Sequence, residues 1–447
     1  MLRQSASEAS SVPERARQGA GPQGRDWSWV EATVWTDRML AALESGVQGG
    51  KWFSLIDKVI RGSTLAAAWK RVQSNAGAAG VDGQSVECFA RHAETYLNEL
   101  EQSLRSGRYQ PEAVKRVEIP KGAGKTRPLG IPAVKDRIVQ TALKLVVEPI
   151  FEREFCESSY GFRPQRRGRD ALREVNGLIE SGYTHVVDAD LASYFDSIPH
   201  EALLERVEER ISDTRVLELV AGYVRQEVMQ GLERWRPTSG TPQGGVISPL
   251  LANLYLHPLD ELMRARGYRM VRYADDFVVL CETAEQAQAA LREVQAWVEA
   301  NGLTLNAEKT HVGDCRCEGQ GFEFLGYRFE AGRREIRRKS LHSLRDRIRA
   351  HTKRTNGHSL REIIAKLNAV LRGWFEYFKH GTRASTYQSI DGFVRRRLRA
   401  ILCSRHHRPQ FGHSLWASRK WPTTYFAEQG LFTLLQARLQ ASQSRRG

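Results

Sequence analysis

Short apolar runs that alternate with polar turns dominate the middle of the chain. Two such runs flank the Tyr-Ala-Asp-Asp segment at residues 273–276, and this pattern predicts a β-hairpin with two carboxylates at its tip. A third run, residues 186–191, carries Asp188 and Asp190 at alternate positions, which places both side chains on one face of a strand. Acidic side chains from two separate strands are therefore expected at one site.

Helical periodicity surrounds these strands and takes over toward the C-terminus. Residues 283–301 are predicted to form a helix, because Gly302 directly after them is a typical C-cap. Further along, the strand pattern stops and helical runs cover residues 341–352, 359–379 and 386–404. The pattern thus predicts an α+β chain with an all-helical C-terminal region.

Composition narrows the class of protein. The 447 residues exceed what one core holds, so two or three domains are expected, and 41% hydrophobic with 27% charged residues suits a globular protein. No apolar run approaches a membrane span and no secretory signal is visible, which predicts a cytoplasmic protein. The six cysteines include no Cys-x-x-Cys pair, so neither a zinc site nor a disulfide framework is expected. Residues 1–25 have the composition of a disordered tail.

The positive charge is concentrated in the helical C-terminal region. The net charge is +15, yet residues 331–447 hold 26 Lys and Arg against 6 Asp and Glu, while residues 1–330 are slightly acidic. Aromatic residues interleave with this charge at 374–378. A solvated basic face would explain part of the pattern, but the size of the excess favours a polyanionic partner.

Paired carboxylates on buried strands need a compensating cation, and Mg²⁺ prefers carboxylate oxygens while leaving positions open for phosphates. The order of the strand with Asp190, then a Pro-Gln-Gly segment, then Tyr-Ala-Asp-Asp resembles motifs A, B and C of reverse transcriptases. Residues 125–132 and 160–164 are similar to the fingers motifs of the same family. Residues 303–310 are similar to its motif D, and residues 322–329 to its primer-grip hairpin. As a set, over roughly residues 55–435, they resemble the reverse transcriptases of bacterial group II introns.

The resemblance implies a right-hand polymerase fold, with fingers and an antiparallel palm sheet followed by a helical thumb and maturase-like region. It also implies that the endonuclease domain found at the C-terminus of some members is missing. The expected parts are a tail (1–25), an N-terminal extension (26–83), fingers (84–180), palm (181–338), thumb and maturase-like RNA-binding domain (339–435) and a second tail (436–447).

The same resemblance assigns the chemistry. Asp190 and Asp275 are expected to bridge two Mg²⁺ ions, with Asp276 and the backbone carbonyl of Leu191 as further ligands. Lys309 occupies the position of a general acid for pyrophosphate, although a salt-bridged surface lysine fits the sequence almost equally well.

The resemblance also assigns substrate contacts. Phe195 is expected to pack on the sugar and exclude a 2′-hydroxyl, with a core aromatic as the alternative. Gln243 and Gly244 are expected at the incoming nucleotide, and Lys125, Arg127 and Arg163 at its triphosphate. In the basic C-terminal region, Arg395, Arg396 and Arg397 are expected to bind the RNA.

Together these features predict an RNA-directed DNA polymerase that also binds its intron RNA and assists splicing in the bacterial cytoplasm. Its partners would be intron RNA, a DNA primer or target, and deoxynucleoside triphosphates. Two alternatives remain open from the sequence: a phage-defence or CRISPR-associated reverse transcriptase, and a splicing-only RNA-binding maturase.

Overall fold

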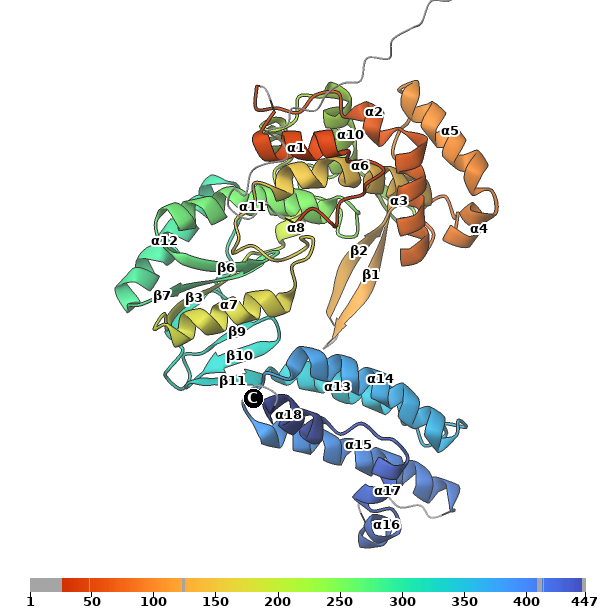
Figure 1. Ribbon diagram of the computed structural model, residues 1–447, viewed down its shortest axis with the longest axis vertical. Coiled ribbons are helices and arrows are strands. Elements are labelled where there is room, and N and C mark those ends of the chain that lie inside the picture. The colour runs from red at the N-terminus through yellow and green to blue at the C-terminus, as the bar shows by residue number, and fades with distance from the viewer. Residues whose placement is uncertain (1–25, 48, 123–124, 408–411, 413, 444–447) are drawn as a thin grey trace, which may run out of the picture.

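The chain folds into an α+β structure whose central sheet lies between two largely helical regions (Figure 1). The computed structural model describes residues 26–47, 49–122, 125–407, 412 and 414–443. No helix among these residues is long and apolar enough to cross a membrane. The predicted right-hand polymerase fold of α+β class is confirmed.

The N-terminal region consists of a group of helices and a long two-stranded ribbon that projects from them (Figure 1). The ribbon strands are β1 (Val114–Gly122) and β2 (Lys125–Ile131). The ribbon continues into a four-stranded sheet of order β2-β1-β4-β5, with β4 (Val228–Gln230) and β5 (Glu233–Trp235) contributed by a later segment. The helices of this region are α1 (Asp37–Ser45), α2 (Ile56–Val59), α3 (Gly62–Asn75), α4 (Val86–Arg91), α5 (Ala93–Arg105) and α6 (Val134–Glu152).

The central sheet, which we call the palm sheet, has the order β6-β7-β3-β8 and is antiparallel throughout. Its strands are β3 (His185–Asp190), β6 (Arg269–Tyr273), β7 (Asp276–Cys281) and β8 (His311–Asp314). The helices that precede it or cover it are α7 (Gly168–Glu180), α8 (Tyr194–Ser197), α9 (His200–Glu208), α10 (Thr214–Val224), α11 (Ser248–Ala265) and α12 (Ala284–Ala300).

The two faces of the palm sheet belong to two different hydrophobic clusters. Val187 and Val279 point into the cluster that contains α11 and α12, whereas Val186 and Val278 point into the cluster that contains α7. Alternation along each strand thus puts α11 and α12 on one face and α7 on the other. The structure groups α7 with the palm sheet, whereas the sequence boundary at residue 180 assigned this helix to the fingers.

A three-stranded sheet and a set of helices complete the chain. The order β11-β10-β9 joins β9 (Phe322–Phe324), β10 (Tyr327–Glu330) and β11 (Arg333–Ile336). The helices that follow are α13 (Arg338–His351), α14 (Leu360–Phe378), α15 (Ala384–Arg405), α16 (Leu415–Lys420), α17 (Thr423–Glu428) and α18 (Leu434–Gln443).

The C-terminal tail predicted from residue 436 onward is replaced by helix α18 as far as Gln443. The carboxylate of Asp391, in α15, accepts hydrogen bonds from the backbone N–H groups of Leu434 and Leu435 at 3.0 Å each. A distant side chain therefore satisfies the first N–H groups of this helix. The predicted tail at residues 1–25 lies outside the described residues.

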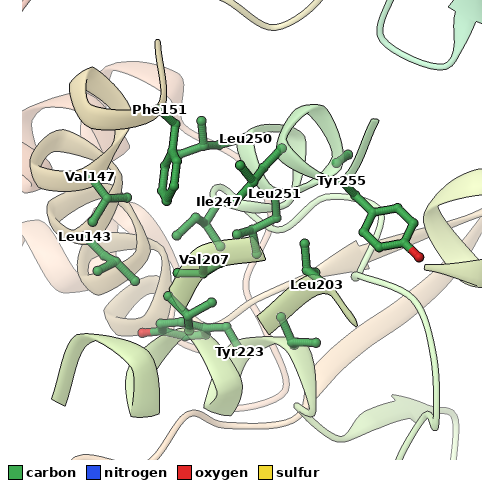
Figure 2. Close-up of a cluster of buried hydrophobic side chains, with 14 of the residues drawn as sticks. Leu143, Val147, Phe151, Leu203, Val207, Tyr223, Ile247, Leu250, Leu251 and Tyr255 are labelled. Carbon is green, nitrogen blue, oxygen red and sulfur yellow. The ribbon is translucent and has the colours of Figure 1, made fainter. Parts of the chain in front are cut away.

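Helices α6 and α11 are largely buried and connect the N-terminal region with the palm. Figure 2 shows Leu143, Val147 and Phe151 of α6 packed with Leu250 and Leu251 of α11. In α6, 17 of the 19 residues are buried, and in α11 11 of the 18, so both helices lie largely in the interior. These helices give the active-site strands a rigid support, since protein interiors are close-packed.

Candidate active site

The carboxylates predicted to hold metal ions meet at one end of the palm sheet. In the register of β3 and β7, Asp190 lies directly opposite Asp276, and Tyr273 of β6 lies opposite Asp276 on the other side. Residues 274 and 275 form the turn between β6 and β7, with Ala274 at φ +61°. Directly opposed residues in antiparallel strands have Cβ atoms about 5 Å apart, so these acids form one cluster.

Burial opposes the ionisation of these acids. It raises the pKa of Asp276 to about 7, with repulsion from Asp188, Asp275 and Asp190 acting in the same direction. Burial likewise raises the pKa of Asp275, and that of Asp188 to about 6. A group of carboxylates held in this state gains stability from a bound cation.

The donor set fits a hard divalent cation. All the clustered ligands are oxygens, which Mg²⁺ prefers, and a single side-chain cation, Lys309, forms an ion pair with Asp190 at 2.7 Å. Among the described residues, no group of three or more His, Cys, Asp or Glu side chains forms a ready-made metal cage.

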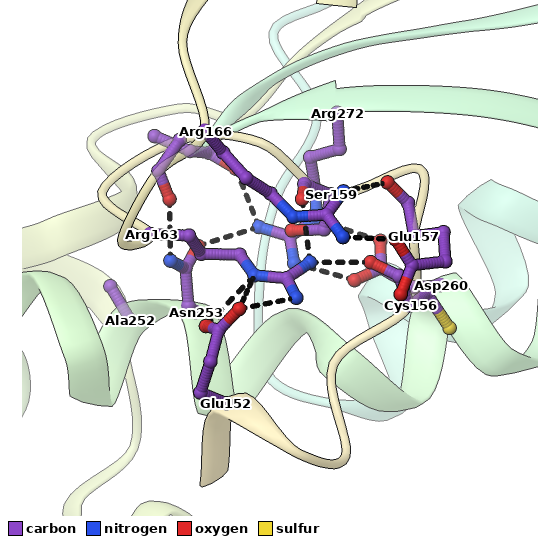
Figure 3. Close-up of polar contacts among 12 residues, drawn as sticks. Glu152, Cys156, Glu157, Ser159, Arg163, Arg166, Ala252, Asn253, Asp260 and Arg272 are labelled. Carbon is purple, nitrogen blue, oxygen red and sulfur yellow. Dashed lines mark hydrogen bonds and ion pairs between the residues drawn. The ribbon is translucent and has the colours of Figure 1, made fainter. Parts of the chain in front are cut away.

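A buried arginine holds the acidic turn in place from the opposite face of the sheet. The guanidinium of Arg272 is fully buried and donates two hydrogen bonds to the carboxylate of Asp260 in α11, at 2.7 and 2.5 Å (Figure 3). Its third nitrogen, Nη1, donates to the side-chain oxygen of Asn253 and to the backbone carbonyl of Ala274, both at 2.9 Å. The turn that carries Asp275 is thus tied to helix α11.

A second contact fixes the same turn from the side. The amide of Asn253 donates to the carbonyl of Gly161 at 2.7 Å, and a Cβ added to Gly161 would lie 2.2 Å from the backbone nitrogen of Ala274. Only glycine permits this close approach. Arg272, Asn253 and Asp260 were not predicted from the sequence, although an arginine directly after the apolar pair Met270–Val271 was a visible signal.

The segment after α12 lies against the end of β3. The backbone N–H of Asn306 donates to the carbonyl of Asp190 at 2.7 Å, and that of Ala192 donates to the carbonyl of Thr304 at 2.8 Å. These bonds place Lys309, whose side chain is 59% exposed, at the carboxylate of Asp190.

The predicted sugar gate sits beside these acids. The ring of Phe195 is half-buried and makes edge contacts with Phe162 and Tyr194, at centroid distances of 6.4 and 5.7 Å. Its carbonyl accepts a hydrogen bond from the N–H of Thr241 at 2.7 Å, which joins motif A to the loop that contains Gln243. Phe162 is 48% exposed, so one side of this aromatic pair faces solvent.

The Pro-Gln-Gly loop is joined to the base of the β1–β2 ribbon. The N–H of Gly130 donates to the carbonyl of Gln243 at 2.5 Å. Gly244 adopts φ +118°, and a Cβ there would lie 2.1 Å from the carbonyl oxygen of Gly130. Glycine is required at this position by both its conformation and its surroundings. The loop therefore positions Gln243 where ribbon and palm meet.

The structure separates the three basic residues predicted at the triphosphate. Arg127 is exposed on β2, and the side chain of Lys125 lies outside the described part of the chain. Arg163 has a side chain only 1% exposed, paired with Glu152 at 2.7 Å and bonded to the carbonyl of Ser159 at 2.6 Å. Its donors are committed to buried partners, which favours a structural role, and its contact with the triphosphate stays a prediction (Figure 3).

The predicted RNA-binding arginines also differ from one another. Arg397 donates to the hydroxyl and the carbonyl of Thr352 at 3.0 and 2.7 Å, so it connects α15 to the end of α13. Arg396 is exposed and Arg395 half-buried. These contacts give Arg397 a structural role, and Arg396 is the most accessible of the three. RNA binding by these arginines stays a prediction.

The aromatic residues of α14 join the helical region to the three-stranded sheet. Phe375 and Phe378 are buried, and the hydroxyl of Tyr377 donates to the carbonyl of Leu325 at 2.9 Å. The hydroxyl of Tyr327 in turn donates to the carbonyl of Tyr377 at 2.8 Å. These contacts show that the aromatic residues pack the helical region against the three-stranded sheet.

Comparison with known proteins identifies the same two parts of the chain. Residues 119–329 match the family of reverse transcriptases (RNA-dependent DNA polymerases), and residues 341–424 match the group II intron maturase-specific domain. Protein YkfC of Escherichia coli K12 is 38% identical over 309 residues, which cover 59% of this chain and 79% of YkfC. The group II intron-encoded protein LtrA of Lactococcus lactis subsp. cremoris is 34% identical over 208 residues, covering 46% of this chain and 34% of LtrA.

Solved structures are more distant. A Cas6-RT-Cas1–Cas2 complex shares 23% identity at a TM-score of 0.36, covering 57% of this chain and 43% of that chain. Telomerase from Candida albicans shares 12% identity at a TM-score of 0.41, covering 71% and 64%. The extensive match to YkfC and the two family matches carry the assignment. The chain belongs to the group II intron-encoded reverse transcriptases with a maturase-specific domain.

Proposed function

We propose that this protein copies RNA into DNA with two Mg²⁺ ions, and that it binds intron RNA to assist splicing and mobility. The observation that supports the polymerase most directly is the opposition of Asp190 and Asp276 in the β3–β7 register, with Asp275 in the adjoining turn. The chain spans only about a third of LtrA, so the substrates and partners are part of the proposal.

Asp190 and Asp275 would bridge the metal ions, with Asp276 beside them. The carbonyl of Leu191 suits a further ligand, because the bonds made by Asp190 and Ala192 to the 304–306 segment leave it on the opposite edge of the strand. Bound Mg²⁺ would lower the pKa of the primer 3′-hydroxyl and neutralise charge on the pyrophosphate.

The remaining side chains would bind and orient the nucleotide. Phe195 would pack on the sugar and disfavour a 2′-hydroxyl, while Gln243 and Gly244 would form the surface under the base. Arg127, exposed on the ribbon, and Lys125 are the fingers residues proposed for the triphosphate. Lys309, whose amine lies 2.7 Å from the carboxylate of Asp190, would give its proton to the leaving pyrophosphate.

Substitution of Asp275 tests the polymerase. Asp275→Asn should abolish extension of a DNA primer on an RNA template, because it removes a bridging carboxylate but keeps the side-chain volume. RNA affinity should stay close to wild type, since the basic helices lie elsewhere. Asp314→Asn, in the same palm sheet and paired with Arg316, is the matched control and should retain extension. Extension by Asp275→Asn at the wild-type rate would refute the assignment.

A splicing assay separates the second activity. Asp275→Asn should still accelerate splicing of a cognate group II intron RNA if the RNA-binding surface works independently of DNA synthesis. If the wild-type protein assists splicing but extends no primer under any condition, the chain is a splicing-only maturase. The match of residues 341–424 to the maturase-specific domain is the observation that favours RNA binding in either case.

A further inference from the structure

A concave basic surface lies outside the carboxylate cluster, where α7, the β10–β11 strands and the end of α14 meet. Its volume is about 590 Å³. We call it the α7 groove and define it by the six basic residues that line it: Arg167, Arg169, Arg173, Arg334, Lys379 and His380. None of these was singled out from the sequence, because they come from three distant segments.

Among the described residues that line the α7 groove, cations outnumber acids. Asp170 is the one acidic residue that lines it, and it pairs with Arg173 at 3.1 Å. Glu376 stands beside it, 2.9 Å from Lys379 and 3.9 Å from Arg169. The five Arg and Lys residues therefore outnumber these two acids. A solvated helix face would explain the arginines of α7, but not the arrival of cations from two other elements at the same hollow.

Arg334, one of the residues that line the groove, is held in place by hydrogen bonds. Arg334 donates from Nε to the carbonyl of His380 at 2.9 Å and from Nη1 to the side-chain oxygen of Asn176 at 3.0 Å. Its guanidinium also lies 5.9 Å from the ring centre of Tyr327. A guanidinium held in this way loses little freedom on binding a phosphate, which favours recognition over a mobile lysine.

The groove spans the joint between the palm and the maturase-specific domain. A Cβ at Gly168, the first residue of α7, would lie 3.4 Å from the hydroxyl of Tyr377 and 3.6 Å from the ring of Tyr273. Lys379 and His380 belong to the region that matches the maturase-specific domain. A strand bound in the groove would therefore contact both parts at once.

We propose that the α7 groove binds the phosphate backbone of intron RNA, as a docking surface separate from the template site. The proposal rests on the proposed function, from which the RNA partner is taken. The fixed guanidinium, the excess of cations and the share contributed by the maturase-specific domain all favour RNA over a protein partner.

The test removes two cations of α7, the exposed Arg173 and the half-buried Arg169, and leaves Arg334 intact. Arg169→Gln with Arg173→Gln is compared with Arg206→Gln with Arg264→Gln, a control that also removes two arginines paired with acids on helix surfaces. Equilibrium affinity is measured for a transcribed group II intron RNA and for poly(U) across a salt series. Primer extension on a short template at saturating RNA is measured separately.

The groove variant should bind the intron transcript at least several-fold more weakly than the control. The slope of log affinity against log salt should flatten by about 1.4, at about 0.7 for each lost single-strand contact. Short-primer extension should persist. Unchanged affinity and slope would reduce the groove to a solvated surface, and a loss confined to extension would assign it to the primer–template duplex; either result overturns the proposal. Failure of the wild type to extend any primer would count against the polymerase but not against this RNA contact.

Discussion

Replacement of Arg272 should separate the stability of the palm from the positioning of its catalytic turn. Arg272→Met leaves Asp260 buried without a partner, because their pair has side chains 0% and 1% exposed. Removing one member of such a pair destabilises a protein by about 3–5 kcal/mol. The single variant is therefore expected to lose activity through unfolding as well as through misplacement of Asp275.

The double variant Arg272→Met with Asp260→Leu removes both charges. Apolar replacement of a buried pair is often neutral or favourable by about 1–4 kcal/mol, while the two acceptors left by Arg272, on Asn253 and Ala274, cost about 1–3 kcal/mol each. The terms largely cancel, so the free energy of unfolding should return to within about 2 kcal/mol of wild type. The turn, however, loses the hydrogen bond to the carbonyl of Ala274.

The assay compares folding and chemistry in the same proteins. Urea unfolding followed by tryptophan fluorescence reports stability, and steady-state primer extension reports kcat. A displacement of about 1 Å at a reacting centre costs roughly 100-fold in rate. The double variant should therefore be folded yet about 100-fold slower. A double variant with wild-type kcat would show that Arg272 stabilises the palm without positioning the turn.

Two further predictions concern individual side chains. Phe195→Ala should raise the ratio of ribonucleotide to deoxyribonucleotide incorporation, measured as kcat/KM for matched pairs; an unchanged ratio in a folded variant would make Phe195 a core aromatic only. In metal-free protein, the folded-state pKa of Asp276 is about 7, well above the unfolded value of about 3.9, so the native state binds more protons between these values and stability falls as pH rises. The stability advantage of Asp276→Asn over wild type should therefore grow from about pH 4 to about pH 7, as measured by urea unfolding in EDTA, whereas a constant difference would contradict the shifted pKa.

The sequence predicted correctly those parts of the fold that depend on residues close together in the chain. The apolar runs around residues 273–276 predicted the hairpin, and the helix expected at 283–301 is α12, Ala284–Ala300, with Thr283 as its N-cap. The proposed ligands Asp190, Asp275 and Asp276 were also visible from the sequence alone. They follow from strand alternation, which depends only on residues close in the chain.

Contacts between distant segments decided the features that the sequence did not predict. Helix α18 depends on a cap from Asp391, and Arg163 is buried because Glu152 and a nearby carbonyl take its donors. Arg397 resembles its neighbours in the sequence, but only it reaches Thr352. A charged residue in a motif can therefore bind substrate or hold the fold, and the positions of its partners decide which.

The palm sheet carries both kinds of charged residue, a cluster of acids at the proposed metal site and a buried ion pair that stabilises the fold. Asp188, Asp190 and Asp276 lie on the face of the palm sheet that holds Tyr273, which is where we propose that metal ions bind. Burial raises the pKa values of Asp188 and Asp276 there. On the opposite face, the charge of Arg272 is balanced by Asp260 within a dry core, which requires no ligand. Alternation along β6 thus puts Tyr273 on the face of the proposed metal site and Arg272 on the face with the buried ion pair. Residues 274 and 275 form the turn between β6 and β7, and Arg272 donates a hydrogen bond to the carbonyl of Ala274 in this turn. Because Arg272 is also bound to helix α11, the helix gives the proposed metal ligands a rigid support.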